Sequence, residues 1–375
     1  MIDIARKILL HDKLRFVITV SGVAFAVTLV CVQVGLFFGL LSSATVTIEQ
    51  ADADLWVTSK NTANVDMAIP FSENFVQRVR SVAGVQRADN LLVWFHRIIL
   101  PTGATESILL YGLDHFTRWR LPWKVAEGDL EDLGRGEFIM LDESAKNRYG
   151  PFATGDFREL GDHRVKIIGI TQEAKSFTTT PMAFMDYHRI QSLDPFTLGG
   201  QTTYILVKLA AGANAIAVRD EIQRRLPYHD VHLRETWAQK SRAYWVTNTG
   251  IGLNMGLTVF LGCLVGIVVV AQTLYTSVMD HFKEFATVKA IGGSNASIYR
   301  IIAKQAVIAA VLGFAAGAAL TLSLQPLLAI VDLKLILEPG FFALVLTGTV
   351  GLCLAASAIS FRKIASMDPA LVFRS

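Results

Sequence analysis

The chain has 375 residues, of which 52% are hydrophobic and only 18% are charged, and its formal net charge is +3. Globular proteins carry about 25% charged residues, and here four long stretches contain none. Each exceeds the roughly 20 residues that cross a 30 Å hydrocarbon core, which excludes a soluble protein, a disordered chain and a β-barrel of short alternating strands. The uncharged stretches are residues 16–48, 243–279, 305–331 and 339–361.

We therefore predict an α-helical membrane protein with four transmembrane helices, one plus three, and a large mixed α+β extracytoplasmic domain between helices 1 and 2. The first stretch is too long for a signal peptide, and its head contains Asp3 and Asp12. The predicted segments are a cytoplasmic amphipathic head (1–15), helix 1 (16–45), the α+β domain (46–242), a stalk with helix 2 (243–279), a cytoplasmic junction (280–304), helix 3 (305–331), a short outer loop (332–338), helix 4 (339–361) and a cytoplasmic tail (362–375).

Lys and Arg gather on the cytoplasmic side of a membrane, so their distribution predicts the orientation. The head, the junction and the tail together hold 11 Lys and Arg against 5 Asp and Glu, a net of +6. Both termini are therefore predicted to be cytoplasmic. No basic stripe with interleaved aromatic residues is present, so the basic balance indicates topology rather than nucleic-acid binding.

Within the exposed domain, short runs rich in Val, Ile, Leu, Phe and Tyr predict strands. These runs are residues 54–58, 91–100, 107–111, 138–141, 165–170 and 203–208. Helical spacing predicts helices over 72–82, with Ser72 as N-cap and Gly84 beyond the end, and over 213–226. A third, polar helix is expected to start near Glu235 and to run into the second span without a break.

Sequence signals for catalysis or metal binding are weak. Cys31, Cys263 and Cys353 all lie in predicted spans, and the only close histidine pair is His229 and His232. We expect a strand here to put both imidazoles on one face, as a metal pair could require, but no third ligand is evident. We therefore predict no metal, no cofactor and no catalytic residue in this chain. No nucleotide-binding motif is present either, so we expect ATP hydrolysis only in a partner subunit.

The spans themselves contain no ionisable residue, which argues against proton coupling, a channel with charged rings or a voltage sensor. They do contain glycines at GxxxG spacing, which let helices pack backbone to backbone. Gly35 with Gly39 and Gly262 with Gly266 are predicted to pack helices within the chain or in a dimer. Because four spans make a small bundle, an oligomer is expected.

The most informative stretch is 280–302, which we interpret as a helix leaving the bilayer, a glycine stop and a new helix capped by Ser294 or Asn295. The loop is long for a connector and mixes apolar with charged residues, which favours a docking element over a re-entry turn at the headgroups. The predicted docking residues are Lys283, Glu284, Phe285, Val288, Lys289, Ala290, Ile291, Gly292 and Gly293. In the tail, Asp368 as N-cap and Pro369 at the first helical position would start a short helix.

The junction resembles that of FtsX/MacB-like (type VII) ABC transporter permeases, in which an acidic residue precedes a basic-Ala-hydrophobic-Gly sequence, here Glu284 and residues 289–292. The tail sequence 367–370, Met-Asp-Pro-Ala, is similar to the close of that family. Residues 53–58 (Ala-Asp-Leu-Trp-Val-Thr) and 69–73 (Ile-Pro-Phe-Ser-Glu) look like the DevC branch. The one-plus-three layout extends the resemblance over nearly the whole chain.

The resemblance implies a permease subunit that transmits motion from a separate cytoplasmic ATPase, which holds ATP and Mg, to its periplasmic domain. Implied partners are that ATPase, a second permease copy, and a periplasmic adaptor with an outer-membrane channel for export. The implied location is the bacterial inner membrane. Two alternatives remain open: a lipoprotein-releasing permease, and a non-transporting relay that controls a cell-wall hydrolase or a sensor.

Overall fold

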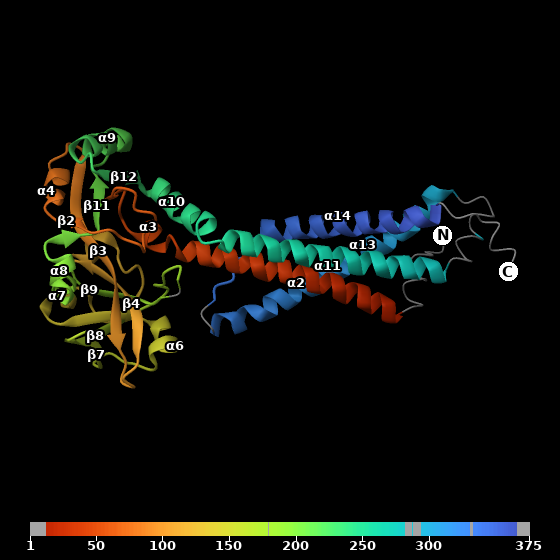
Figure 1. Ribbon diagram of the computed structural model, residues 1–375, viewed down its shortest axis with the longest axis horizontal. Helices are drawn as coiled ribbons and strands as arrows, with labels where there is room; N and C mark the ends of the chain where they lie inside the picture. Colours follow the sequence, from red (N-terminus) through yellow and green to blue (C-terminus); the bar gives the residue numbers. More distant parts are fainter. Residues whose placement is uncertain (1–12, 179, 282–286, 288–293, 331–332, 366–375) are drawn as a thin grey trace. The chain divides into compact units, whose positions relative to one another are not determined.

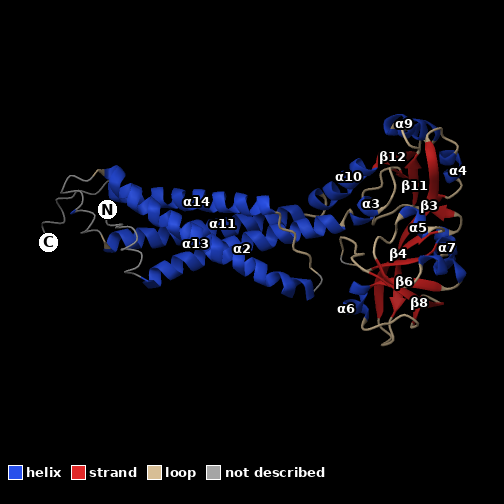
Figure 2. Ribbon diagram, turned by 180° about the vertical axis from the view of Figure 1, so that it is seen from behind, coloured by secondary structure: helices blue, strands red, loops and turns tan. Residues whose placement is uncertain are grey.

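The computed structural model describes residues 13–178, 180–281, 287, 294–330 and 333–365. The chain divides into two compact units, which we call the helical unit (Met1–Gly39 with Gly252–Ser375) and the α/β unit (Leu40–Ile251). In the described residues, four helices are long and apolar enough to cross a membrane, one before the α/β unit and three after it (Figure 1). The strands belong to the α/β unit (Figure 2). The predicted fold class is therefore confirmed.

The long helices are α2 (Lys13–Ser43), α11 (Ile251–Asp280), α13 (Asn295–Ile330) and α14 (Pro339–Ala365). Pro339 opens α14, where a missing backbone N–H costs no helical hydrogen bond. Before α13, the hydroxyl of Ser294 accepts a hydrogen bond from the backbone N–H of Ser297 at 3.3 Å. The predicted cap at Ser294 is thus confirmed.

The prediction that a polar helix runs unbroken into the second span is wrong. Helix α10 (Arg234–Thr247) ends before Asn248, and α11 begins only at Ile251. Between them, Gly250 adopts a φ of +70°, which an α-helix does not accommodate. Asn, Thr and Gly are also weak helix formers, so three such residues in a row explain the interruption.

The α/β unit is built on a ten-stranded sheet, whose central element is the long strand β3 (Val85–Ile99). The sheet order is β12 (His229–Leu233), β1 (Leu55–Ser59), β11 (Tyr204–Leu209), β3, β4 (Thr105–Leu113), β9 (Met182–Asp186), β6 (Phe138–Asp142), β8 (His163–Thr171) and β5 (Val125–Glu127), with β7 (Phe157–Leu160) paired to β3 and β8. A separate small sheet contains β2 (Phe71–Ser72) and β10 (Gln201–Thr202). All six predicted strands are present.

Strand β3 is shared by two lobes. Its first half, up to Leu91, pairs with β11, and its second half, from Leu92, pairs with β4. The first lobe therefore contains β12, β1 and β11, and the second contains β4 to β9. The second lobe closes on itself, because Leu160 of β7 pairs both with Ile98 of β3 and with His163 of β8.

Shorter helices cover these strands, and one prediction about them needs correction. Ser72 is not an N-cap: it lies in β2, and α4 begins at Phe75 after Asn74, whose side chain makes no capping hydrogen bond. The apolar spacing alone predicts too early a start for this helix, because Phe71 and Ser72 form strand β2. The other helices are α3 (Val46–Gln50), α5 (Phe116–Trp119), η1 (Leu130–Arg135), η2 (Glu143–Ala145), α6 (Lys146–Tyr149), α7 (Tyr187–Leu193), α8 (Pro195–Leu198) and α9 (Ala215–Arg225).

Alternating side chains give the sheet of the second lobe two buried faces, because successive strand residues point in opposite directions. On β4, Ile108 and Leu110 point into the closed lobe, whereas Leu109 and Tyr111 face the other core. That other core is rich in aromatic residues and includes Trp56, Tyr204 and Trp237, all fully buried. It joins the two lobes to α3 and α10.

Candidate functional site

The predicted ATPase-docking residues (Lys283, Glu284, Phe285, Val288, Lys289, Ala290, Ile291, Gly292 and Gly293) and the tail residues Asp368 and Pro369 lie outside the described residues. Their roles stay predictions. Beside this junction, Asp280 at the end of α11 forms an ion pair with Arg15 near the start of α2. This pair fixes one helix end against the other at the end of the helical unit where the junction begins.

The predicted glycine positions pack against other elements of the same chain. A Cβ on Gly262 would lie 2.7 Å from Cδ2 of Leu29, and a Cβ on Gly266 would lie 3.0 Å from Cβ of Ala26. Both contacts are with α2. Helix α13 also approaches α2 closely, because a Cβ on Gly317 would lie 2.7 Å from the carbonyl oxygen of Ala24. Helix α2 is therefore packed closely between α11 and α13.

Gly35 and Gly39 instead meet the segment before α14. A Cβ on Gly35 would lie 2.7 Å from Cδ1 of Leu335, and one on Gly39 would collide with the carbonyl oxygen of Lys334. The backbone N–H of Ile336 donates to the carbonyl of Gly35 at 3.1 Å. These contacts are intramolecular, and a dimer contact through the same glycines stays a prediction.

Where the chain enters and leaves the α/β unit, polar groups tie α3 to α10. Arg242 of α10 forms an ion pair with Glu49 of α3, and the hydroxyl of Thr45 donates to the same carboxylate at 2.9 Å. The hydroxyl of Ser241 donates to the carbonyl of Ala44 at 3.1 Å. We call these residues, with Trp245, the base joint. It couples the incoming and the outgoing chain.

A loop of the second lobe reaches the base joint. Phe177, between β8 and β9, stacks on Trp245 of α10 with ring centroids 4.0 Å apart and 18° between the planes. Its backbone lies beside the carboxyl group of Asp66. Phe177 therefore touches the outgoing helix with its ring and the interior of the unit with its backbone.

Asp66 is the most unusual titratable group of the α/β unit. It is 3% exposed, and its Oδ2 atom has no hydrogen-bond partner. Burial raises the pKa of this carboxyl group to about 7, and the backbone of Phe177 only partly opposes the shift. The flanking segment is fixed by the hydroxyl of Tyr204, which donates to the carbonyl of Val65 at 2.9 Å. No sequence signal marks these residues, because the polar segment around Asn64 and Asp66 looks like an exposed loop.

The expectation that His229 and His232 share one face of a strand is wrong, because strand residues three apart point to opposite faces. His229 packs against the rings of Phe71 and Phe75, each at 4.8 Å. His232 stacks on Trp237 at 4.9 Å, and burial lowers its pKa to about 4. Both imidazoles pack against aromatic rings, and the described residues contain no cluster of three His, Cys, Asp or Glu side chains suited to a metal ion.

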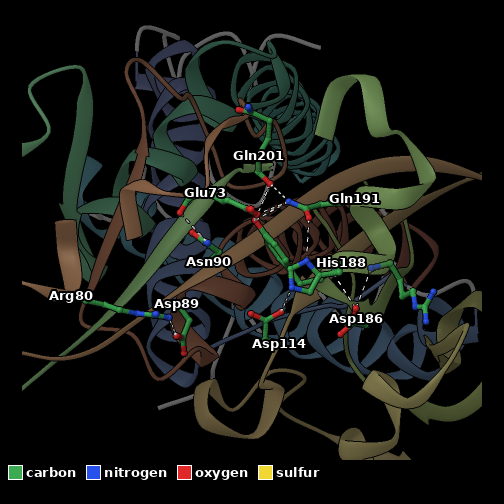
Figure 3. A network of polar contacts seen from close by, with 11 residues as sticks. Glu73, Arg80, Asp89, Asn90, Asp114, Asp186, His188, Gln191 and Gln201 are labelled. Carbon is green, nitrogen blue, oxygen red and sulfur yellow. Dashed lines mark hydrogen bonds and ion pairs between the residues drawn. The ribbon is translucent and has the colours of Figure 1, made fainter. Parts of the chain in front are cut away.

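A second polar network joins the two lobes on another side of the unit (Figure 3). Glu73, which precedes α4, accepts hydrogen bonds from the hydroxyl of Tyr187 at 3.0 Å and from the amide of Gln191 at 2.7 Å. Its backbone carbonyl accepts from the amide of Asn90 on β3 at 3.2 Å. Since Tyr187 and Gln191 lie on α7 of the second lobe, Glu73 holds the lobes together.

Two family models match successive parts of the chain. Residues 16–225 match the MacB-like periplasmic core domain, and residues 256–369 match the FtsX-like permease C-terminal region. The first match alone covers more than half of the chain. The chain is an ABC transporter permease of the MacB/FtsX type. A permease of this type is a multi-pass membrane protein that works with an ATPase subunit and a second permease.

Similar proteins extend over the whole permease. An uncharacterised ABC transporter permease of Mycobacterium bovis is 27% identical over 369 residues, which is 96% of each chain. Another, of Mycobacterium tuberculosis, is 23% identical over 367 residues, also 96% of each. Among solved structures, the periplasmic region of MacB from Actinobacillus actinomycetemcomitans is 14% identical with a TM-score of 0.41, over 51% of this chain and 94% of that one.

Proposed function

We propose that this permease transmits motion from a separate cytoplasmic ATPase, which binds ATP and Mg, to its α/β unit on the outer side of the bacterial inner membrane. Export then proceeds through a periplasmic adaptor and an outer-membrane channel. The N-in orientation is supported by the net charge of +6 on the three segments assigned to the cytoplasm. The adaptor and the channel are supported by the DevC-like sequences at residues 53–58 and 69–73.

The observation that carries the proposal is the base joint. Helix α3 directly follows α2 in the chain, and α10 directly precedes α11. A movement of α2 relative to α11 therefore pulls on α3 and α10. The Arg242–Glu49 ion pair and the Ser241 hydrogen bond resist their separation. The Phe177–Trp245 stack passes the displacement to the second lobe, because Phe177 belongs to the β8–β9 connection.

A distance measurement across two permease copies tests this route. The chain is purified with its ATPase, its native cysteines are replaced by Ser, and a spin label is placed at Thr102, an exposed turn residue between β3 and β4. Adding ATP should change the distance between the two labels. Phe177→Ala should abolish this change while ATP hydrolysis and ATPase co-purification remain, because the variant removes one ring of the stack. Phe196→Ala is the matched control, since that ring is fully exposed. An unchanged response in Phe177→Ala would reject the route.

The orientation has its own test. An impermeant thiol reagent applied to intact cells should label Asn61→Cys on the α/β unit and should not label Asn295→Cys at the start of α13. Labelling at position 295 would reverse the proposed orientation. Export through an adaptor would be contradicted if detergent-solubilised complexes consistently capture a second, different permease and no adaptor, which is the result expected of a lipoprotein-releasing system.

A further inference from the structure

The helical unit contains an apolar groove of about 280 Å³ between α2, α11 and α14. Its walls are formed by residues 23–34 of α2, 259–270 of α11 and 341–353 of α14. Small residues line the space: Gly266 and Cys263 belong to the α11 wall and Gly348 to the α14 wall, and a Cβ on Gly348 would meet nothing within 4 Å. The groove opens sideways along α14, where the lining residues Leu344 and Leu352 are 68% and 36% exposed.

The lining does not suit water or a polar ligand. Apart from the two thiols of Cys263 and Cys353, its only polar side chain is Thr349, whose hydroxyl donates to the carbonyl of Val345 at 2.7 Å. A water molecule needs two to four polar partners, and apolar cavities without them stay dry. An empty groove, however, leaves its lining atoms without van der Waals contacts on one side. A hydrocarbon ligand satisfies both conditions.

The dimensions of the groove select one kind of hydrocarbon. An apolar cavity of about 150 Å³ accommodates benzene, so by proportion this groove has room for about 11 carbon atoms. Along α2 it spans 11 helical steps of about 1.5 Å, or roughly 17 Å, about half of the hydrocarbon core. A helix of a second copy, about 10 Å across, would need roughly 1,300 Å³ over that length. The space therefore fits one extended hydrocarbon chain.

We propose that this groove is a binding site for one acyl chain of a bilayer phospholipid, held as a resident ligand between α2, α11 and α14. The lining residues lie near the middle of α2 (Lys13–Ser43) and of α11 (Ile251–Asp280), so the groove lies around the middle of the membrane, where the distal part of an acyl chain reaches. Bulk lipid is as apolar as the lining, so selectivity comes from contact with three walls and not from the hydrophobic effect. The proposal requires only that these helices lie in a membrane and goes beyond the proposed export function.

Two glycines on the same helix provide a matched test. Gly348 lines the groove and Gly351 does not, although a Cβ on either meets nothing within 4 Å. The full chain is reconstituted in nanodiscs containing phosphatidylcholine with a diazirine near the middle of one acyl chain, and crosslinked peptides are mapped by mass spectrometry. We expect labelling of groove residues around Val345 and Ile267 in the unmodified chain. Gly348→Leu should lower it by about tenfold, because its side chain occupies the space of four carbons, whereas Gly351→Leu should leave it unchanged.

Equal labelling in both variants would overturn the proposal, since it would show annular lipid only. Disulfides between Cys263 of two copies in native membranes, together with absent lipid crosslinks, would also overturn it in favour of a second permease copy. If Gly348→Leu does not fold, Cys263→Phe with Cys263→Ser as its control asks the same question from the α11 wall. Native mass spectrometry of the unmodified chain should additionally retain one phospholipid per chain, and its complete loss in mild detergent would count against a resident ligand.

Discussion

Each of the two units of this permease is stabilised internally by a different kind of side chain. The α/β unit buries its largest residues, including Trp56, Trp237 and Tyr204, between hydrogen-bonded strands and helices. In the helical unit the closest contacts are made by glycine, as where Gly262 meets Leu29 and Gly317 meets the backbone of Ala24.

The difference follows from the two solvents. In water, burial of a large apolar side chain is favourable in proportion to its area, so aromatic residues stabilise the α/β unit. In a bilayer the alternative to a protein contact is a lipid contact of similar polarity, and association depends on close packing and on backbone approach. All six tryptophans lie in the α/β unit, so tryptophan fluorescence follows the unfolding of that unit alone.

The largest effect is expected from truncating a buried aromatic residue of the α/β unit. Trp56→Ala should lower the free energy of unfolding by about 3–5 kcal/mol, because it removes a fully buried ring and leaves a cavity. Urea titration of the full chain in detergent, followed by tryptophan fluorescence, measures it. Trp56→Phe is the control and should cost much less, since it keeps a ring and removes an indole N–H that has no hydrogen-bond partner. Similar losses in both variants would contradict a packing role.

The second effect depends on pH. The pKa of Asp66 rises from 3.8 to about 7 on folding, so between those values the folded chain binds a proton that the unfolded chain does not. Its contribution to stability is therefore favourable at low pH and is lost as pH rises from about 4 to 7. Three pKa units correspond to about 4 kcal/mol at most. Asp66→Asn, which stays neutral, should be stabilising at pH 8 relative to the unmodified chain, and the gain should shrink towards pH 4.5.

Asp52 serves as the control, because its pKa is shifted in the direction opposite to that of Asp66. Partial burial pushes the pKa of Asp52 up, but the hydrogen bond from Lys208 and the charge of Arg87 outweigh burial and hold it below its usual value. Asp52→Asn should therefore destabilise the chain at pH 7, and the loss should fade as pH falls through the folded pKa. Identical pH profiles for the two variants would show that burial of Asp66 does not govern its titration.

The third effect concerns the helical unit. Gly317→Leu should destabilise the bundle by about 1–3 kcal/mol, because a Cβ there already lies 2.7 Å from the backbone oxygen of Ala24. Titration with a denaturing detergent, followed by helical circular dichroism, measures the change. Gly340→Leu adds the same side chain in open space on α14 and should be nearly neutral. A comparable loss at Gly340 would mean that helix propensity, and not packing, sets the effect.

The smallest effect is expected at the surface of the base joint. Arg242→Ala breaks a solvent-exposed ion pair with Glu49 and should lower the free energy of unfolding by only about 0.2–1 kcal/mol. Arg224→Ala on α9 breaks another exposed pair, with Glu221, and should have the same small effect on stability. Only Arg242→Ala should weaken the ATP-dependent distance change. Equal responses of both variants would remove the base joint from the proposed route.

The features that the sequence predicts well are those with a local physical signature. The absence of charge marks the four spans, and runs such as 165–170 mark strands, because burial and backbone geometry act on neighbouring residues. Strand β9 (Met182–Asp186) has no clear signal in the sequence, since its Met and Ala residues have weak strand preferences and its place depends on pairing with β4 and β6.

The base joint could not be predicted for a different reason. Phe177 and Trp245 are nearly 70 residues apart in sequence and neither belongs to a motif. Asp66 lies in a polar segment that resembles a surface loop, and its burial depends on the tertiary placement of Tyr204. Conversely, the interruption at Gly250 was visible in the sequence, but the apolar residues that follow favoured a continuous helix.

The shared strand β3 has a consequence for the order in which the chain is made. Strand β1 is synthesised early, but its sheet neighbours β11 and β12 lie about 150 and 175 residues later in the sequence. The closed second lobe is encoded almost entirely between them, and domains complete in sequence order as they are produced. A newborn chain therefore holds an unpaired β1 with both edges open while the second lobe assembles, and open edges invite pairing with other chains. We therefore expect the first lobe to depend most on a chaperone while this permease is being synthesised.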